Sequence, residues 1–86
     1  MKLFYCPNCE DVVKMTKEVR HCECGSASGF YQDDLNAIIN QNAIPIGFSN
    51  RSFIDALVCR PEKGQGKEFS AFVIPEKCNT VKVWKS

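Results

Sequence analysis

The sequence predicts an α+β fold, in which a cysteine-rich N-terminal hairpin is continuous with a small antiparallel sheet and one helix. Two close cysteine pairs lie near the N-terminus, several short segments alternate apolar and polar residues, and only one segment has helical spacing. A chain of 86 residues makes a single domain, and one this small buries too little surface to fold securely without an added staple. We therefore expect a compact domain held by its cysteines.

The first predicted strand is Leu3-Phe4-Tyr5, which leads into the first cysteine pair. Val12 to Met15 and Glu18 to Arg20 are two short stretches that we expect to pair as a hairpin, with its turn within Lys14 to Lys17. This hairpin leads to the second cysteine pair. The small residues from Gly25 to Gly29 then suit a tight loop.

A strand is predicted to open at Phe30-Tyr31. Asp33 to Asn36 could cap a helix through Ile39 or form a turn into a strand over Ala37 to Ile39. The turn is favoured, because the stretch is short, rich in Asn and β-branched where its apolar side chains fall.

The next strand is predicted from alternation after a turn at Gln41-Asn42. Its apolar residues are Ile44, Ile46 and Phe48. Pro45 suggests that this strand lies at a sheet edge, since proline cannot donate to a ladder. A helix then begins near Arg51, capped by Ser49 or Asn50, and Pro61 fits its stop. Three apolar residues share one face of this helix: Phe53, Ala56 and Leu57.

Two late strands follow a loop over Glu62 to Lys67. The segment from Phe69 to Ile74 is apolar on nearly both faces, so we expect it at the centre of the sheet, ended by Pro75. Val81 and Val83 indicate a last strand that finishes in Trp84.

The cysteine spacing predicts one structural zinc site with four ligands: Cys6, Cys9, Cys22 and Cys24. Two cysteines separated by two residues can turn both sulfurs toward one point, as a tetrahedral zinc ion requires. The second pair is one residue tighter, but Gly25 supplies the permissive backbone that such a turn needs. His21 is the alternative fourth ligand.

The segments Cys6-Pro7-Asn8-Cys9 and Cys22-Glu23-Cys24-Gly25, joined by a short hairpin, resemble the zinc-ribbon, or rubredoxin-like, group. The resemblance covers residues 1–29, and it implies a metal role for the four cysteines. We expect residues 30–86 to form a small α+β part packed on this ribbon. The shortened second pair departs from the group's pattern and favours zinc over a rubredoxin-type iron site.

A dithiol redox role for Cys6 and Cys9 is the competing interpretation of the first pair. No long helix or βαβ pattern follows it, and a second pair stands at ribbon distance, so we favour metal binding. Cys59 is expected to be a small core residue of the helix, while Cys78, between Lys77 and Asn79, is expected to be more exposed.

The charge balance gives little support to non-specific nucleic-acid binding. The formal net charge is +1, and four thiolates with one Zn²⁺ would change it by −4 and +2, to about −1. The alternative of nucleic-acid or nucleotide binding would use two groups of cations: Lys14, Lys17 and Arg20 near the metal, and Lys63 and Lys67 in the glycine-containing loop.

Other expectations concern partners and location. Tyr31, Phe72 and Trp84 are candidates for an exposed binding surface or dimer interface. A closed four-cysteine zinc has no open position for water, so we expect no enzymatic activity. We find no signal-peptide core and no membrane-spanning apolar run, and expect a cytoplasmic protein without membrane contact.

Two further segments, residues 44–50 and 71–75, resemble those of small uncharacterised bacterial and bacteriophage reading frames. That resemblance implies a compact, phage-encoded accessory protein whose work is binding. The first functional hypothesis is thus a zinc-stabilised module that contacts a protein partner or itself. Nucleic-acid or nucleotide binding is the alternative, and a small enzyme is the third.

Overall fold

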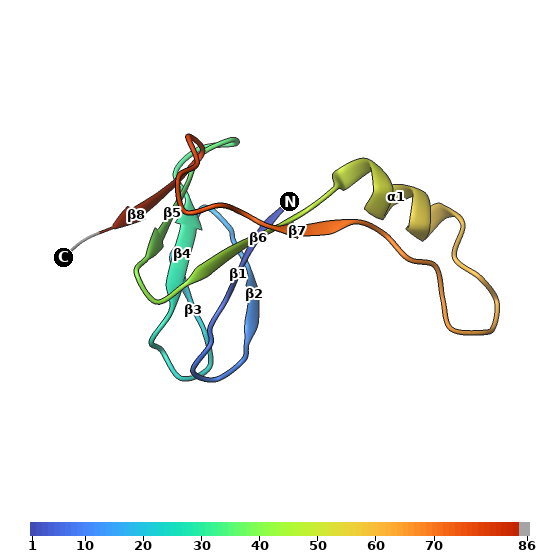
Figure 1. The fold of residues 1–86 in the computed structure, drawn as a ribbon, viewed down its shortest axis with the longest axis horizontal. Helices are drawn as coiled ribbons and strands as arrows, with labels where there is room; N and C mark the ends of the chain where they lie inside the picture. The colour runs from blue at the N-terminus through green and yellow to red at the C-terminus, as the bar shows by residue number, and fades with distance from the viewer. Residues whose placement is uncertain (85–86) are drawn as a thin grey trace.

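Two four-stranded β-sheets and one helix make up the computed structural model, which describes residues 1–84 (Figure 1). The elements in chain order are β1 (Lys2–Tyr5), β2 (Val12–Lys14), β3 (Arg20–His21), β4 (Ser28–Tyr31), β5 (Ala37–Asn40), β6 (Ile44–Phe48), α1 (Asn50–Val58), β7 (Ala71–Val73) and β8 (Val81–Trp84). The α+β class is confirmed, although there are two sheets where one was expected. The last two residues of the predicted 30–86 part lie outside the described residues.

The first sheet has the order β2-β1-β6-β7, and the second has the order β3-β4-β5-β8. All pairs are antiparallel except β5 and β8, which run parallel, so the prediction of a purely antiparallel sheet is wrong. Parallel neighbours need a long connection, and the chain through β6, α1 and β7 supplies it. Because β1 lies between β2 and β6, the first sheet joins residues from both sides of position 29.

Each cysteine pair lies in the turn of its own hairpin. β2 pairs with β1 and β3 pairs with β4, so the predicted hairpin between Val12–Met15 and Glu18–Arg20 is wrong. In the first turn the Glu10 N–H donates to the Cys6 carbonyl at 2.7 Å, and Glu10 takes a positive φ of 61°. A turn that brings two cysteines together already reverses the chain, so the strand that follows it returns along the strand before it.

The core lies between the two sheets, which both contribute to it. Its members include Phe4 and Val13 from the first sheet, and Ala37, Ile39 and Val81 from the second. Gly29 of β4 is tightly enclosed: an added Cβ would lie 3.0 Å from Ile39 Cγ2 of the neighbouring strand β5, and 3.2 Å from Met15 Sδ, which follows β2 of the first sheet.

Pro45 lies in an internal strand, so its predicted edge position is wrong. The Phe48 N–H donates to the Met1 carbonyl, so the backbone groups of Phe48 face β1. Successive residues of an antiparallel strand direct these groups to opposite sides, so Pro45, three residues earlier, has its nitrogen toward β7. At that position the Ile74 N–H donates to the Pro45 carbonyl at 3.0 Å. The ladder between β6 and β7 stops there, which is why a missing donor is tolerated.

β7 is an edge strand, and all three of its residues are exposed. The prediction of a central strand buried on both faces is therefore wrong, although the strand ends before Pro75 as expected. The remaining short strands over Phe30-Tyr31, Ala37–Ile39, Ile44–Phe48 and Val81–Trp84 are confirmed.

The helix projects from the two sheets together with the loop after it (Figure 1). We call residues 50–73, from α1 through β7, the α1–β7 arm. Its base is a cluster of three aromatic rings, Phe48, Phe53 and Phe69, with centroids 4.8 to 5.4 Å apart. Ser49 is the N-cap by position, but its side chain makes no capping hydrogen bond, so that part of the helix prediction is wrong.

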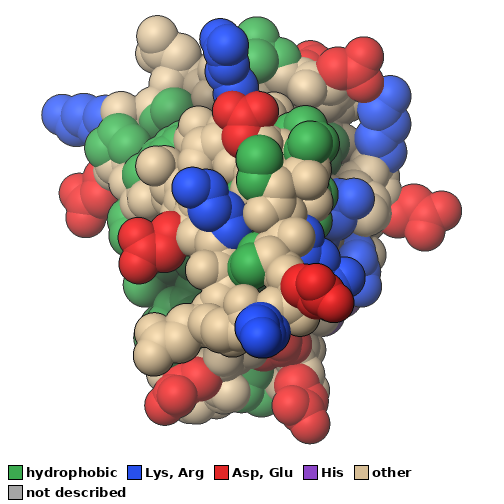
Figure 2. All heavy atoms as spheres, turned by 90° about the vertical axis from the view of Figure 1, so that its right-hand side faces the viewer, with side chains coloured by type: hydrophobic (Ala, Val, Ile, Leu, Met, Phe, Trp, Pro, Cys, Tyr) green, Lys and Arg blue, Asp and Glu red, His purple; other side chains and the backbone are tan. Residues whose placement is uncertain are grey.

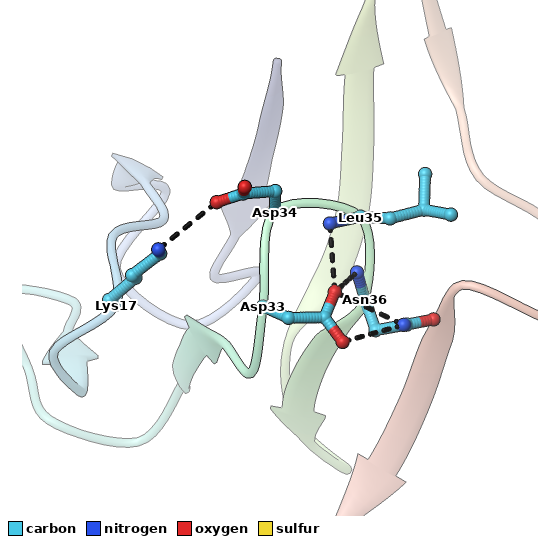
Figure 3. A network of polar contacts seen from close by, with 5 residues as sticks. All are labelled: Lys17, Asp33, Asp34, Leu35 and Asn36. Carbon is cyan, nitrogen blue, oxygen red and sulfur yellow. Dashed lines mark hydrogen bonds and ion pairs between the residues drawn. The ribbon is translucent and has the colours of Figure 1, made fainter.

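The predicted turn after β4 is confirmed. The Asp33 carboxylate accepts hydrogen bonds from the Leu35 and Asn36 N–H groups at 2.9 and 2.8 Å, and from the Asn36 side-chain amide (Figure 3). These bonds hold the pKa of Asp33 down at about 2, with the Asn36 side chain the largest cause. The exposed ion pair between Lys17 and Asp34, 3.0 Å apart, links this turn to the segment before β3.

Candidate metal centre

Four cysteine sulfurs meet where the two sheets come together. Cys6 and Cys9 lie in the turn between β1 and β2, and Cys22 and Cys24 lie in the turn between β3 and β4. Their Sγ atoms all lie within 4.8 Å of one another. The structure thus brings together the four residues that the spacing singled out, and takes two of them from each sheet.

The separations fit one tetrahedral ion. Cys24 Sγ lies 3.7 Å from Cys6 Sγ and 3.5 Å from Cys22 Sγ. A tetrahedron with metal–sulfur bonds of about 2.3 Å has sulfurs about 3.8 Å apart. His21, the alternative ligand, is an exposed residue of β3 outside this group.

The shortened second pair closes its turn through Gly25. Gly25 has a φ of 81°, which suits a residue without a side chain, and its N–H donates to the Cys22 carbonyl at 3.0 Å. This reversal lets two cysteines separated by one residue present their sulfurs to the same point. The expectation that Gly25 permits this turn is confirmed.

Polar groups lie beside the sulfurs of Cys6 and Cys24 and favour their thiolate forms. Ser26 Oγ lies 3.2 Å from Cys6 Sγ and 3.1 Å from Cys24 Sγ, and the Asn8 side-chain amide donates to Cys24 Sγ at 3.3 Å. The Ser26 hydroxyl is the largest cause of a pKa of about 5 for Cys24, followed by Asn8, and it also lowers the pKa of Cys6. Thiolates are the form that binds a metal.

Cys9 differs from Cys6 and Cys24 in the way its surroundings act on the pKa of its thiol. A backbone hydrogen bond from Cys24 favours its thiolate, but burial and the neighbouring sulfurs of Cys24 and Cys22 outweigh it and raise the pKa of Cys9 to about 11. Four sulfurs this close cannot all carry a negative charge unless a cation lies among them. The group is therefore well suited to a divalent metal ion.

A hydrogen bond from the backbone to a carboxylate couples the two turns independently of any metal. The Glu23 N–H donates to Asp11 Oδ2 at 2.9 Å, which joins the second turn to the end of the first. Sequence reasoning missed Asn8, Asp11 and Ser26 as supporting residues. The one signal for them was their position within or beside the cysteine pairs, where residues that hydrogen-bond to metal ligands or to the turns that hold them are expected.

The exposure of the two remaining cysteines is the reverse of the one expected. Cys59 follows the last turn of α1 and is exposed, whereas Cys78 is partly buried against the core. The helix turns Ala56 inward and leaves its C-terminal end in solvent, which is why the core position predicted for Cys59 is wrong. The Thr80 hydroxyl, 3.4 Å away, lowers the pKa of Cys78.

The two groups of cations lie in different hollows. Lys14 and Lys17 line one with Asp33 and Asp34, whereas Lys63 and Lys67 line another on the arm, together with Arg60. The Arg20 guanidinium donates to the Lys14 carbonyl oxygen.

The three candidate surface aromatics lie in different environments. Phe72 and Trp84 are 53% and 60% exposed, but they belong to different sheets. Tyr31 is half-buried, and its hydroxyl accepts a hydrogen bond from the Lys2 N–H at 2.7 Å. Phe72 and Trp84 are therefore two separate candidates for a binding surface, one on each sheet.

Comparison with known proteins yields no relative: no family model, no curated protein and no solved structure matches this chain. The zinc-ribbon resemblance accordingly rests on the two cysteine pairs and the turns that hold them. Within residues 1–84, no helix is long and apolar enough to cross a membrane.

Proposed function

We propose that this protein is a zinc-stabilised binding protein that acts through protein–protein contact, with the α1–β7 arm as its contact surface. Zinc is the proposed ion because four thiolates at tetrahedral separations are its usual structural ligand set. A site with four protein ligands leaves no position for water, so the proposed role of the metal is structural and the proposal includes no enzymatic step.

The observation that carries the proposal is the concentration of exposed apolar side chains on the arm. Half of the exposed large apolar residues within the described part of the chain lie there: Ile54, Leu57, Val58, Phe69, Phe72 and Val73. Figure 2 views the molecule from the side on which the arm projects, and hydrophobic side chains lie at the surface there among charges of both signs. An apolar surface with a charged surround is typical of protein interfaces.

The shape of the molecule supports the same surface. The structure measures 47 × 26 × 22 Å, and the arm accounts for much of the long dimension in Figure 1. A projecting segment has few intramolecular contacts with which to cover its apolar side chains. Contact with another protein would remove them from water, which is the main driving force of association.

Site-specific photo-crosslinking tests this proposal. A photoreactive residue at Leu57, which is 54% exposed on the arm, is compared with one at Val19, which is 51% exposed before β3. We expect protein adducts from position 57, whether with another protein or with a second copy, and none above background from position 19. Both variants should keep one zinc per chain, which shows that they are folded.

Adducts with nucleic acid from position 57, or equal protein adducts from both positions, would overturn the proposed function. The first result would favour the nucleic-acid alternative, for which affinity should also fall steeply with added salt. The second would show only random collision.

A further inference from the structure

We propose that β7 pairs antiparallel with β7 of a second copy of this chain, which joins the first sheets of two molecules into one continuous eight-stranded sheet. The inference rests on the proposed function and names the partner at that surface. It follows from the free backbone groups of β7, from its side chains and from the symmetry of the pairing that they allow.

The outer edge of β7 presents unused backbone groups. The Ser49 N–H donates to the Ser70 carbonyl and the Ile74 N–H donates to the Pro45 carbonyl, so residues 70 and 74 face β6. By the alternation of an antiparallel ladder, Phe72 also faces β6, while Ala71 and Val73 direct their N–H and C=O groups away from the sheet. These two residues form an edge on which a further strand can pair.

β7 is the only edge strand among those described that carries no charged or basic side chain. The other three edges contain Lys14 in β2, Arg20 in β3 and Lys82 in β8. Charges at a sheet edge prevent pairing with another chain, and an apolar edge without them is a site of association. The residues from Phe69 to Ile74 are also uncharged, so this property extends beyond the strand itself.

The pairing that uses all the free groups is symmetric. With Phe72 of one copy opposite Phe72 of the other, Ala71 of each lies opposite Val73 of its partner strand. Each of these two outward-facing pairs exchanges both of its N–H···O bonds, so the interface gains four backbone hydrogen bonds. A small residue then faces a larger one on one side of the sheet, and two aromatic rings face each other on the other side, where such pairs add stability.

The Phe72 ring is already held in place for this contact. It lies over Gly47 of β6, where an added Cβ would come within 2.5 Å of its Cζ atom. The ring therefore covers the glycine backbone and still leaves 53% of the residue exposed. A side chain fixed before association loses little conformational freedom in the complex.

A second copy is the occupant that these features fit best. The same two residues supply the hydrogen bonds on both sides, as a twofold axis requires. The net charge near zero gives little electrostatic repulsion between copies. The Val73 side chain, 69% exposed, would lose much of its contact with water in the pair.

Sedimentation equilibrium of the zinc-loaded protein over a range of concentrations tests the pairing. We expect the mass of two chains for the wild type, and the mass of one chain for Val73→Lys at the same concentrations, with association weakened about tenfold or more because each copy brings a charge to the joint edge. Val12→Lys is the matched control, since Val12 is 51% exposed at the opposite edge of the same sheet. It should dimerise as the wild type does.

A second variant tests the register independently of stability. Phe72→Cys, made together with Cys59→Ser to remove the exposed native thiol, places two sulfurs at a non-hydrogen-bonded antiparallel pair. Mild oxidation should link two chains in this variant, and should not do so when Val12→Cys is made in the same background.

The results distinguish a failure of the self-pairing from a failure of the proposed function. A wild type of one-chain mass throughout, or Val73→Lys that dimerises like the wild type, overturns the self-pairing. If a one-chain wild type still forms adducts from Leu57 with a different protein, the proposed function stands and only the second copy is excluded as partner. A dimer that persists in Val73→Lys but fails in Val12→Lys would place the interface at β2.

Discussion

At the scale of single residues, Ser26 determines much of the chemistry at the four cysteines. Its hydroxyl lies 3.1 to 3.2 Å from the sulfurs of Cys24 and Cys6, one from each sheet. It is the largest cause of the lowered pKa of both thiols. A thiol with a pKa of about 5 remains a thiolate in mildly acidic solution, where an ordinary thiol with a pKa of 9.0 would be protonated.

Ser26→Ala should therefore weaken zinc binding and make it more sensitive to acid. The pKa of Cys24 should rise toward its ordinary value, so protons compete with the metal at higher pH. We expect the affinity to fall about 10–100-fold, as is usual when a group that supports a metal ligand is removed. Competition with a colorimetric chelator at several pH values measures both effects.

Ser49→Ala is the control for that substitution. Ser49 lies at the helix N-cap but its side chain makes no capping hydrogen bond, so its loss should leave zinc affinity unchanged. Equal affinity and an unchanged pH of release for Ser26→Ala would show that the hydroxyl does not support the thiolates.

At the scale of elements, the turn between β4 and β5 is built by one carboxylate. Asp33 accepts hydrogen bonds from two backbone N–H groups and one side-chain amide, and so fixes the direction in which β5 leaves the turn. Asp favours such turns because its side chain can satisfy the backbone locally. This local origin explains why the turn was predicted correctly from four residues.

Asp33→Ala should destabilise the protein equally at pH 7.5 and pH 6. The folded pKa of about 2 lies below the ordinary value of 3.8, so the stabilising contribution is complete above 3.8 and is lost only as pH falls toward 2. Both test conditions lie above this window. Urea unfolding at the two pH values measures the shift in midpoint.

Asp34→Ala is the comparison for the turn. Within the described residues, the one polar contact of the Asp34 side chain is an exposed ion pair with Lys17, and such pairs contribute little to stability. A midpoint that changes as much in Asp34→Ala as in Asp33→Ala would show that charge, and not the turn, is responsible.

At the scale of the whole molecule, the four cysteines lie close together at a place where a bound metal ion would join the two sheets. Each sheet contributes one turn and two sulfurs, and the core between the sheets is small. Domains of this size usually need a metal, a disulfide or a partner in addition to their core. A metal bound here would add its binding free energy directly to folding.

Removal of the metal should therefore unfold the protein, and both sheets should lose their packing in the same transition. Cys22→Ser should abolish stoichiometric zinc binding and the near-ultraviolet circular dichroism of the packed core. Cys59→Ser, at an exposed cysteine outside the group, should keep one zinc per chain and the native spectrum. Elemental analysis and circular dichroism, with and without chelator, measure these outcomes.

A native spectrum in Cys22→Ser, or in chelated wild type, would mean that the core alone holds the sheets. Replacement of the metal by Co²⁺ adds an independent check, because a tetrahedral four-thiolate site gives strong visible absorption bands that other geometries lack. Their absence would contradict the proposed ligand set.

The sequence by itself determined what depends on neighbouring residues. Each close cysteine pair, the Asp33 turn and the helix after Ser49 follow from local spacing and local residue types, whose effect does not require the rest of the chain. The meeting of the two pairs was predicted from the four ligands that one metal ion needs. Most short strands were also placed correctly, from short aromatic or β-branched segments and, for Ile44–Phe48, from alternation, which reports the two faces of a strand.

Only the tertiary structure decided which strands pair and which surfaces remain exposed. The apolar segment around Phe72 looked central from composition, but no strand within residues 1–84 covers its outer edge. The parallel pairing of β8 with β5 joins residues 44 positions apart, as in Ala37 and Val81. Pairing and burial depend on contacts between distant segments, and a pattern read along the chain shows the faces of a strand but not its neighbours. For β7, that difference turned an expected core strand into the proposed interface.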